Sequence, residues 1–239
     1  MEWEEEMKHI LEVKELTKQY PTKTGVFTAV DGISLSLRKG EVLGFLGANG
    51  AGKSTLLITL SGVLKPASGE VLMHGSVDSL ISLGAGFDRE LNAIENIYLY
   101  ASLHKVPKER IQERIPSILE FAELQEFAET PIRYYSSGMY ARLGFSCAID
   151  INPDILLVDE VLAVGDERFN KKCRDVMFKL LQSGKTIVMV THNLSMIEKM
   201  ADQVGVLSKG RLIYFGDPST ALEVYRDKNY EFALDGKRL

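Results

Sequence analysis

A glycine-rich segment near the start of the chain has the residue types and spacing needed to bind phosphate. Residues 47–54 read GANGAGKS and match the pattern GxxxxGK[ST] at every fixed position. Glycines let backbone N–H groups approach phosphate oxygens closely, and the positive end of a following helix faces the same anion. Lys53 can reach the β- and γ-phosphates of a nucleotide, and the Ser54 hydroxyl can bind Mg²⁺.

The sequence therefore predicts a phosphate loop that binds ATP together with Mg²⁺. A glycine-rich turn without a ligand is the alternative, but an apolar run before the segment and a helical pattern after it favour the phosphate loop. The residues expected to contact ATP in this loop are Gly47, Ala48, Asn49, Gly50, Ala51, Gly52, Lys53, Ser54 and Thr55.

Two later apolar runs end in polar side chains that could act on a bound phosphate. Ile155–Val158 is followed by Asp159 and Glu160, and Thr186–Val190 is followed after one residue by His192. We expect Asp159 to hold Mg²⁺, Glu160 to polarise the attacking water as general base, and His192 to sense the γ-phosphate. Surface acids and a structural histidine are the alternatives. Together with the phosphate loop, the pattern favours ATP hydrolysis.

The elements that must position these residues alternate between strands and helices. This order predicts an α/β fold with a largely parallel sheet, whose ligands bind beyond the carboxyl ends of the strands. Expected strands, besides the two just described, are Ile10–Val13, Ile33–Leu37, Val42–Leu46, Glu70–His74 and Val77–Ser82, with a hairpin of Val204–Leu207 and Arg211–Phe215.

Helical patterns cover 53–63, 136–149, 167–182 and 194–201, a short helix from Pro218, and most of 94–129. Apolar residues recur at helical spacing from Ile111 to Ala122, and Pro116 is expected to break or kink that helix. We interpret the chain as one domain, residues 1–239, with antiparallel β elements and a helical subdomain at about 90–150.

Composition excludes several classes of protein. The 239 residues are 45% hydrophobic and 26% charged, as in soluble globular proteins, and the net charge of −5 disfavours a nucleic-acid binder. No apolar run approaches the ~18 residues of a membrane span, and the acidic start is unlike a secretory signal. Cys147 and Cys173 lack any ligand-like spacing, so reduced thiols packed on helices are expected.

The segment Tyr135–Met139, which reads YSSGM, precedes a helix and stands between the helical stretch and Asp159. Ser136 could simply be a helix cap. In this order, however, the motifs resemble those of the nucleotide-binding domain of ABC transporters, and the resemblance extends from Leu11 to about Tyr225. That family's signature is Leu-Ser-Gly-Gly-Gln, of which Ser136 and Gly138 are kept.

The resemblance implies a head-to-tail homodimer. Each ATP would lie between the phosphate loop of one copy and Ser136, Ser137 and Gly138 of the other. It also implies that Tyr20 stacks on adenine, with an exposed or core tyrosine as the alternative, and that Asp166 links the two sites across the dimer.

One departure from the family's usual sequence narrows the resemblance to a subgroup of ABC ATPases. The family usually has a glutamine near Leu83 or Gly84, where this chain has LGAGF at 83–87. With DEVLAVGD at 159–166, this segment resembles the ATPase subunits that export lipid-linked polysaccharides, namely O-antigen, capsule or wall teichoic acid. The chain has no room for the C-terminal carbohydrate-binding domain of some members.

The resemblance implies two copies of a separate transmembrane permease, which would handle the lipid-linked glycan, and a peripheral position on the cytoplasmic face of the membrane. No nucleic-acid partner is expected. The surface from Leu83 to Tyr100 offers apolar and aromatic residues for contact with the permease, with core packing as the alternative for some of them: Phe87, Leu91, Ile97, Tyr98 and Tyr100. Alternatives are a drug or small-solute exporter, a non-transport ABC ATPase, and a binding-only module. The LGAGF segment disfavours a drug or small-solute exporter. The single ATPase unit disfavours a non-transport ATPase, and the intact catalytic residues disfavour a binding-only module.

Overall fold

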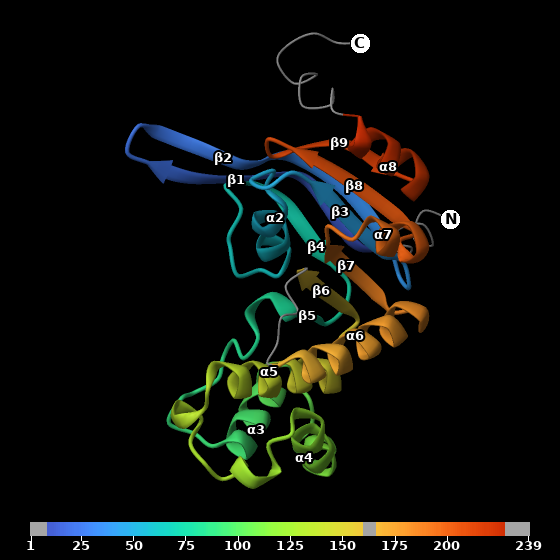
Figure 1. The fold of residues 1–239 in the computed structure, drawn as a ribbon. Coiled ribbons are helices and arrows are strands. Elements are labelled where there is room, and N and C mark those ends of the chain that lie inside the picture. The colour runs from blue at the N-terminus through green and yellow to red at the C-terminus, as the bar shows by residue number, and fades with distance from the viewer. Residues whose placement is uncertain (1–8, 160–165, 228–239) are drawn as a thin grey trace, which may run out of the picture. The chain divides into compact units, whose positions relative to one another are not determined.

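The computed structural model describes residues 9–159 and 166–227, which divide into two units (Figure 1). The first, here called the sheet unit, contains residues 9–77, 154–159 and 180–227. The second, the helical unit, contains residues 78–153 and 166–179. The phosphate loop belongs to the sheet unit and the YSSGM segment belongs to the helical unit.

A three-stranded antiparallel sheet opens the sheet unit. Its order is β2-β1-β4, with bounds β1 His9–Thr22, β2 Gly25–Arg38 and β4 Ser68–Met73. β1 and β2 extend well beyond the strands predicted from sequence because they form one long hairpin. Its register shifts between Val13 and Leu16, and Glu15 has a φ of 47° there, so the apolar alternation that marks a strand is interrupted.

The six-stranded sheet has the order β5-β6-β7-β3-β8-β9. β3 pairs in parallel with both β7 and β8, and β6 pairs in parallel with β7, as the sequence predicts. β8 and β9 form the predicted antiparallel hairpin. The bounds are β3 Val42–Gly47, β5 Val77–Ser79, β6 Ile155–Asp159, β7 Thr186–Val190, β8 Gln203–Ser208 and β9 Arg211–Gly216.

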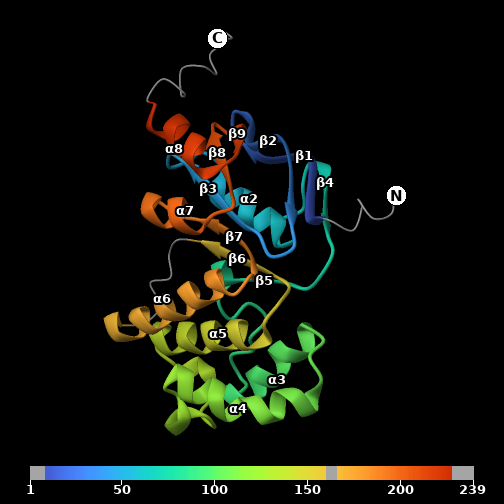
Figure 2. The ribbon, with the colours of Figure 1, turned by 90° about the vertical axis from the view of Figure 1, so that its right-hand side faces the viewer.

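Helices cover both faces of this sheet. Figure 2 shows α2 (Lys53–Leu60) on one side, and α7 (Leu194–Met200) and α8 (Pro218–Arg226) on the other. α2 buries Leu56, Leu57 and Leu60 and covers one face, while α7 and α8 cover the other, which explains why the strands between them are apolar on both faces. Among the residues described, none of the helices combines the length and the apolar character needed to cross a membrane.

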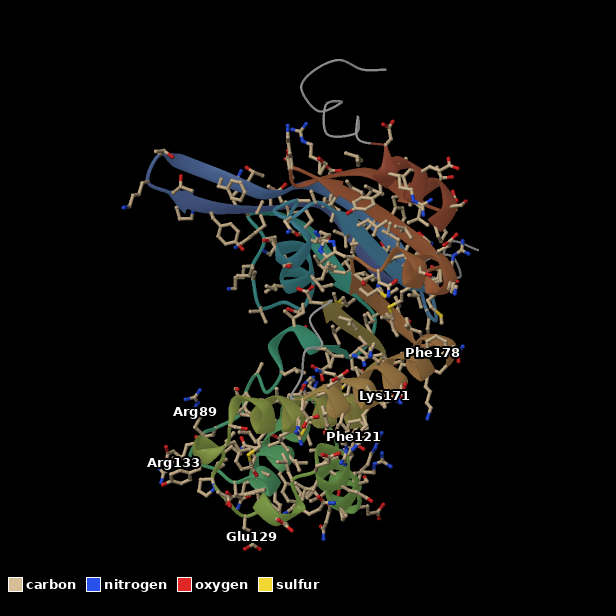
Figure 3. All side chains as sticks on the ribbon, viewed as in Figure 1. Arg89, Phe121, Glu129, Arg133, Lys171 and Phe178 are labelled. Atoms are coloured by element: carbon tan, nitrogen blue, oxygen red, sulfur yellow. The ribbon has the colours of Figure 1, made fainter. Side chains whose placement is uncertain are left out.

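The helical unit contains α3 (Ala93–Leu103), α4 (Lys108–Ala122), α5 (Ser137–Ile151) and α6 (Glu167–Gln182), the last of which continues beyond it. α4 buries the apolar residues that the sequence predicts, and Pro116 lies inside it without ending it. Phe121, Phe145 and Phe169, from α4, α5 and α6, form an aromatic cluster with centroids 5.7–6.3 Å apart. Figure 3 labels Phe121.

The architecture is mixed α/β, with a parallel sheet, antiparallel strands and helices, which confirms the predicted fold class. Cys147 and Cys173 are free and buried on α5 and α6, as expected. Burial raises the pKa of the Cys173 thiol to about 12 and raises that of Cys147 as well, so both stay protonated near neutral pH. The predicted single domain, with its helical insert and no carbohydrate-binding domain, stays a prediction.

Candidate nucleotide-binding site

The phosphate loop lies between β3 and α2 in the sheet unit. Gly50 and Gly52 have φ values of +80° and +102°, and a Cβ on Gly52 would lie 2.3 Å from the carbonyl oxygen of Ala29. Glycine is therefore favoured at Gly50 by conformation, and at Gly52 it is required by both conformation and space. Gly52 is the N-cap of α2 and offers no side-chain acceptor, so the first N–H groups of the helix keep their capacity to bind an anion.

Lys53 is held close to this loop. Its side chain is buried, and its ammonium donates hydrogen bonds of 2.7 Å to the Gly47 carbonyl and 2.9 Å to the Ala48 carbonyl. A cation in this position adds to the positive end of α2. Both features favour a phosphate group over a neutral ligand.

Ser54 and Asp159 meet at the same edge of the sheet. The Ser54 hydroxyl donates to Oδ2 of Asp159 at 3.2 Å, although the two residues are far apart in the chain. A hydroxyl and a carboxylate are the hard oxygen donors that Mg²⁺ prefers. The pair therefore fits Mg²⁺, as the sequence analysis expects.

His192 follows β7 at the same end of the sheet. Asp159 of β6 and Phe45 of β3 both stand opposite Val190 of β7, so the segments after these three strands emerge side by side. His192 is exposed. The structure thus gathers the phosphate loop, Asp159 and His192 at the carboxyl ends of β3, β6 and β7. Glu160, the predicted general base, lies outside the described residues.

Tyr20 lies on the β1–β2 hairpin and is half-buried, with the Lys18 ammonium 5.4 Å from its ring centroid. Phe27 stands directly opposite Tyr20 in the antiparallel register, so the two side chains share one face of the hairpin. Phe27 is 55% exposed. The sequence points to Tyr20 but not to Phe27, because cross-strand pairing depends on a register that the sequence does not show.

The YSSGM segment begins α5 in the helical unit. Ser136 is the N-cap, and its hydroxyl oxygen accepts from the Met139 N–H at 3.2 Å. A hollow of about 670 Å³ lies beside this helix end. Its lining combines the three predicted signature residues with Asp166 and with charged and apolar side chains: Glu123, Leu124, Phe127, Ser136, Ser137, Gly138, Met139, Ala141, Arg142 and Asp166.

Arg142 joins the signature helix to Asp166. Its guanidinium donates to Oδ2 of Asp166 at 2.6 Å and to Oε2 of Glu123 at 3.2 Å. The other oxygen of Asp166 accepts from the Phe169 N–H at the start of α6, and this bond lowers the pKa of Asp166. Asp166 is thereby fixed to α5 and to α6 at once. The sequence shows only that Arg142 is one of the two charged residues on α5, the other being Asp150.

Glu123 anchors a second group of cations. Arg168 and Lys172 of α6 donate to its Oε1 at 3.0 and 3.2 Å, while Arg142 contacts the other oxygen. Partial burial raises the pKa of Glu123, but these hydrogen bonds and charges outweigh burial and leave the pKa below its usual value. Glu123 stays ionised near neutral pH and balances three positive charges beside the signature segment.

The LGAGF segment leads from β5 toward α3. Ile97 and Tyr100, two of the candidates for contact with a permease, are buried, with 1% and 4% of their surface exposed, so the alternative of core packing holds for both. Their apolar side chains fill the core of the helical unit instead. Leu91 and Tyr98 do line a hollow of about 580 Å³ between α3 and α4, together with Glu95, Ser102, Val106, Lys108 and Gln112.

Comparison with known proteins assigns the family. The profile described as ABC transporter matches residues 30–163, more than half of the chain. The chain is a member of the ABC transporter family. As a member of this family it is an ATPase that binds ATP and works in transport.

Two groups of curated relatives stand out for this ABC protein. It is 45% identical over 200 residues to the O-antigen export system ATP-binding protein RfbB of Klebsiella pneumoniae, covering 84% of this chain and 81% of that protein. It is 40% identical over 203 residues to the teichoic acids export ATP-binding protein TagH of Staphylococcus epidermidis, covering 85% of this chain and 76% of that protein. These relatives confirm the predicted resemblance to the polysaccharide-export type.

Solved ABC cassettes share the fold. The dimeric ATP-binding cassette MJ0796 in a post-hydrolysis state, bound to ADP and Pi, superimposes with a TM-score of 0.71 at 24% identity, over 87% of this chain and 98% of that one. An ABC transporter ATP-binding subunit gives a TM-score of 0.72 at 22% identity, over 95% of both chains.

Proposed function

We propose that this chain is the ATP-hydrolysing subunit of an exporter that moves a lipid-linked cell-surface polysaccharide across the cytoplasmic membrane. The polymer is a wall teichoic acid, an O-antigen or a capsule. Supporting this proposal are the relatives, which are named for O-antigen and teichoic acid export and match the chain along most of its length. The alternatives remain a drug or small-solute exporter and a non-transport ABC ATPase.

The contact between Ser54 and Asp159 carries the chemical part of the proposal. It joins the phosphate loop to the β6 carboxylate with oxygen donors suited to Mg²⁺. Mg²⁺ bound there neutralises charge on the phosphates. Lys53 and the N-terminus of α2 bind the same phosphates, Glu160 takes a proton from the attacking water, and His192 orients that water and Glu160.

The signature residues act on a second copy of the chain. Ser136, Ser137 and Gly138 start α5, whose N-terminus attracts negative charge, and a hollow lies beside them. In a head-to-tail homodimer this end of α5 contacts the ATP held by the partner's phosphate loop. Asp166, held by Arg142 to the signature helix, joins the two sites. Two copies of a separate permease complete the exporter at the cytoplasmic face of the membrane.

The hollow beside Leu91 and Tyr98 is the proposed permease contact. It lies between α3 and α4, and Lys108 places its ammonium 5.7 Å from the centroid of the Tyr98 ring at the rim. A short helix of the permease with apolar residues on one face fits such a groove. Tyr98→Ala should weaken assembly with the permease, whereas the exposed Leu103→Ala, on the same helix but outside the groove lining, serves as matched control.

Depletion of the protein in its host tests the export function. Lipid-linked material that accumulates inside the cell is identified by mass spectrometry, with complementation by the wild type and by Lys53→Ala. A polyprenyl-linked polyol-phosphate chain means teichoic acid, a polyprenyl-linked sugar chain means O-antigen, and a glycan on another lipid means capsule. If no glycolipid accumulates, the export proposal is wrong and the cargo is of another class.

A further inference from the structure

The signature helix and the LGAGF segment are joined by one side chain. The Tyr140 hydroxyl donates a hydrogen bond of 2.9 Å to the Gly84 carbonyl, across 56 residues of sequence. Tyr140 lies one turn into α5, and its N–H donates to the Ser136 carbonyl at 2.9 Å. The same residue is therefore attached to the first turn of the signature helix through its backbone and to Gly84 through its side chain.

The fit around this bond is tight. A Cβ on Gly84, whose φ is +74°, would lie 2.7 Å from the Tyr140 ring. A Cβ on Gly144, one further turn along α5, would lie 2.6 Å from the Gly84 nitrogen and 2.9 Å from the Leu83 carbonyl carbon. Two glycines thus let the segment lie directly on α5. A displacement of α5 cannot be absorbed by a gap between the two.

Further contacts lead from Gly84 toward the permease groove, the hollow lined by Leu91 and Tyr98 that we propose as the permease contact. The Gly84 carbonyl also accepts from the Phe87 N–H at 3.0 Å, which closes the segment 84–87 into a turn. The Phe87 ring meets the rings of Tyr140 and Tyr100 edge-on, each at 5.6 Å. Tyr100 is fixed in turn, because its hydroxyl donates to the buried Asp78 at 2.7 Å.

The residues that follow the turn are hydrogen-bonded to the side chain of Asn96. Asn96 is fully buried, its amide donates to the carbonyls of Asp88, Leu91 and Asn92, and its oxygen accepts from the Asp88 N–H. Leu91 lines the groove. The path from Ser136 through Tyr140 and the turn to Leu91 therefore contains a defined bond or ring contact at every step.

We propose that Tyr140 is a positioning residue that transmits nucleotide binding at the start of α5 to the turn at 84–87 and on to the permease groove. The inference rests on the proposed function, in which Ser136–Gly138 contact the partner's ATP. A second link exists, because the backbone N–H groups of Ile132 and Arg133 donate to Leu91 and Arg89. Figure 3 shows Arg89 and Arg133 at the same end of the helical unit. This second link bypasses the turn and so provides an internal reference.

Hydrogen–deuterium exchange of the full chain, with and without AMP-PNP and Mg²⁺, tests the proposal. In the wild type, nucleotide should slow exchange at 47–55, 136–139, 84–87 and 89–93. Tyr140→Phe keeps the ring but removes the hydroxyl. It should abolish the nucleotide response at 84–87, a change of about two- to tenfold in exchange rate, the range set by one hydrogen bond. The responses at 47–55 and 136–139 should remain, and the response at 89–93 should weaken only in part, because the Ile132 N–H still donates to the Leu91 carbonyl.

The exposed Tyr134→Phe is the matched control and should keep every response. Mere loosening of the turn by Tyr140→Phe would speed exchange equally in both states and leave the nucleotide-dependent difference intact, which would overturn the proposal. A turn that does not respond in the wild type would overturn it as well. Absence of protection at 47–55 would contradict the ATP site itself, and the proposal with it, whereas protection there without a response at 84–87 contradicts the Tyr140 proposal alone.

Discussion

Ser54 and Asp159 lie within hydrogen-bonding distance, 3.2 Å, although 105 residues separate them in sequence. The contact exists because α2 begins where β3 ends and because β6 lies two strands away, with β7 between them. A parallel sheet brings the ends of these strands to one edge. The fold thereby brings together the two oxygen donors that we propose to hold Mg²⁺.

Loss of either donor should raise the Mg²⁺ concentration needed for ATP hydrolysis. We expect Ser54→Ala and Asp159→Asn each to raise the half-maximal concentration on the order of 10- to 100-fold, as removal of a charged polar contact does. The double variant should show less than the sum of both effects. Ser61→Ala, at the other end of α2, is the control. Unchanged Mg²⁺ dependence in both single variants would rule out this pair as the metal site.

Replacement of Lys53 should weaken nucleotide binding itself. Its buried ammonium lies at the carbonyls of the phosphate loop, where it adds positive charge next to the helix N-terminus. Lys53→Ala should reduce ATP affinity on the order of 10- to 100-fold, measured by calorimetry, since one charged hydrogen bond contributes about 1.5–3 kcal/mol. The exposed Lys65→Ala should leave affinity unchanged. Wild-type affinity in Lys53→Ala would contradict the assignment of the loop.

Glu160→Gln should separate binding from turnover. The amide keeps the size of the side chain but cannot accept a proton, so ATP should still bind while hydrolysis slows by roughly 10²–10⁴. Light scattering with ATP and Mg²⁺ should then detect a stable dimer. Glu167→Gln, on the exposed start of α6, is the control. Hydrolysis at the wild-type rate in Glu160→Gln would remove Glu160 as the base.

Local patterns made the loop between β3 and α2, the buried strands and the start of α5 at the YSSGM segment predictable. Each is a short run of residues whose types are fixed by conformation or burial, as with Gly52 or the apolar face of α4. The full length of the β1–β2 hairpin was not predictable, because the irregularity near Glu15 breaks the alternation that marks a strand.

Contacts between residues far apart in the sequence could not be predicted either. Ile97 and Tyr100 are residue types that are common at docking surfaces, but both lie on the face of α3 that packs into the core. The hydrogen bonds from Arg142 to Asp166 and Glu123, and from Tyr140 to Gly84, form only when the helices pack. No periodicity records which of two faces of a short helix is covered, so these parts of the site required the structure.

The pKa of Glu123 leads to a prediction about pH. Because its pKa in the folded protein lies below the ordinary value of 4.5, its ion pairs stabilise the fold above about pH 4.5, and this contribution is lost as pH falls through the folded pKa. Glu123→Gln should lower the melting temperature at pH 7 by about 2–4 °C, the equivalent of about 1 kcal/mol for a chain of this size.

The difference between Glu123→Gln and the wild type should shrink below pH 4.5. The exposed Glu120→Gln, on the same helix, should melt like the wild type at every pH. Melting followed by circular dichroism from pH 7 to pH 3.5 measures the effect. A difference that persists unchanged at the acidic end would mean that packing rather than charge is responsible.

Two aromatic residues are candidates for stacking on the adenine ring. Tyr20 and Phe27 face each other across the β1–β2 hairpin and share one face of it. Stacking of a base on an aromatic side chain contributes about 1–3 kcal/mol, so Tyr20→Ala should reduce ATP affinity by about 5- to 100-fold, whereas Tyr20→Phe should retain it. Because a ring stacks on any base, GTP affinity should fall in parallel. Phe27→Ala, measured in the same titration, should leave affinity within about twofold, since the resemblance places Tyr20 and not its neighbour on adenine. A loss in Phe27→Ala with wild-type affinity in Tyr20→Ala would transfer the stacking role to Phe27, and a loss in both would mean that the base lies across the cross-strand pair.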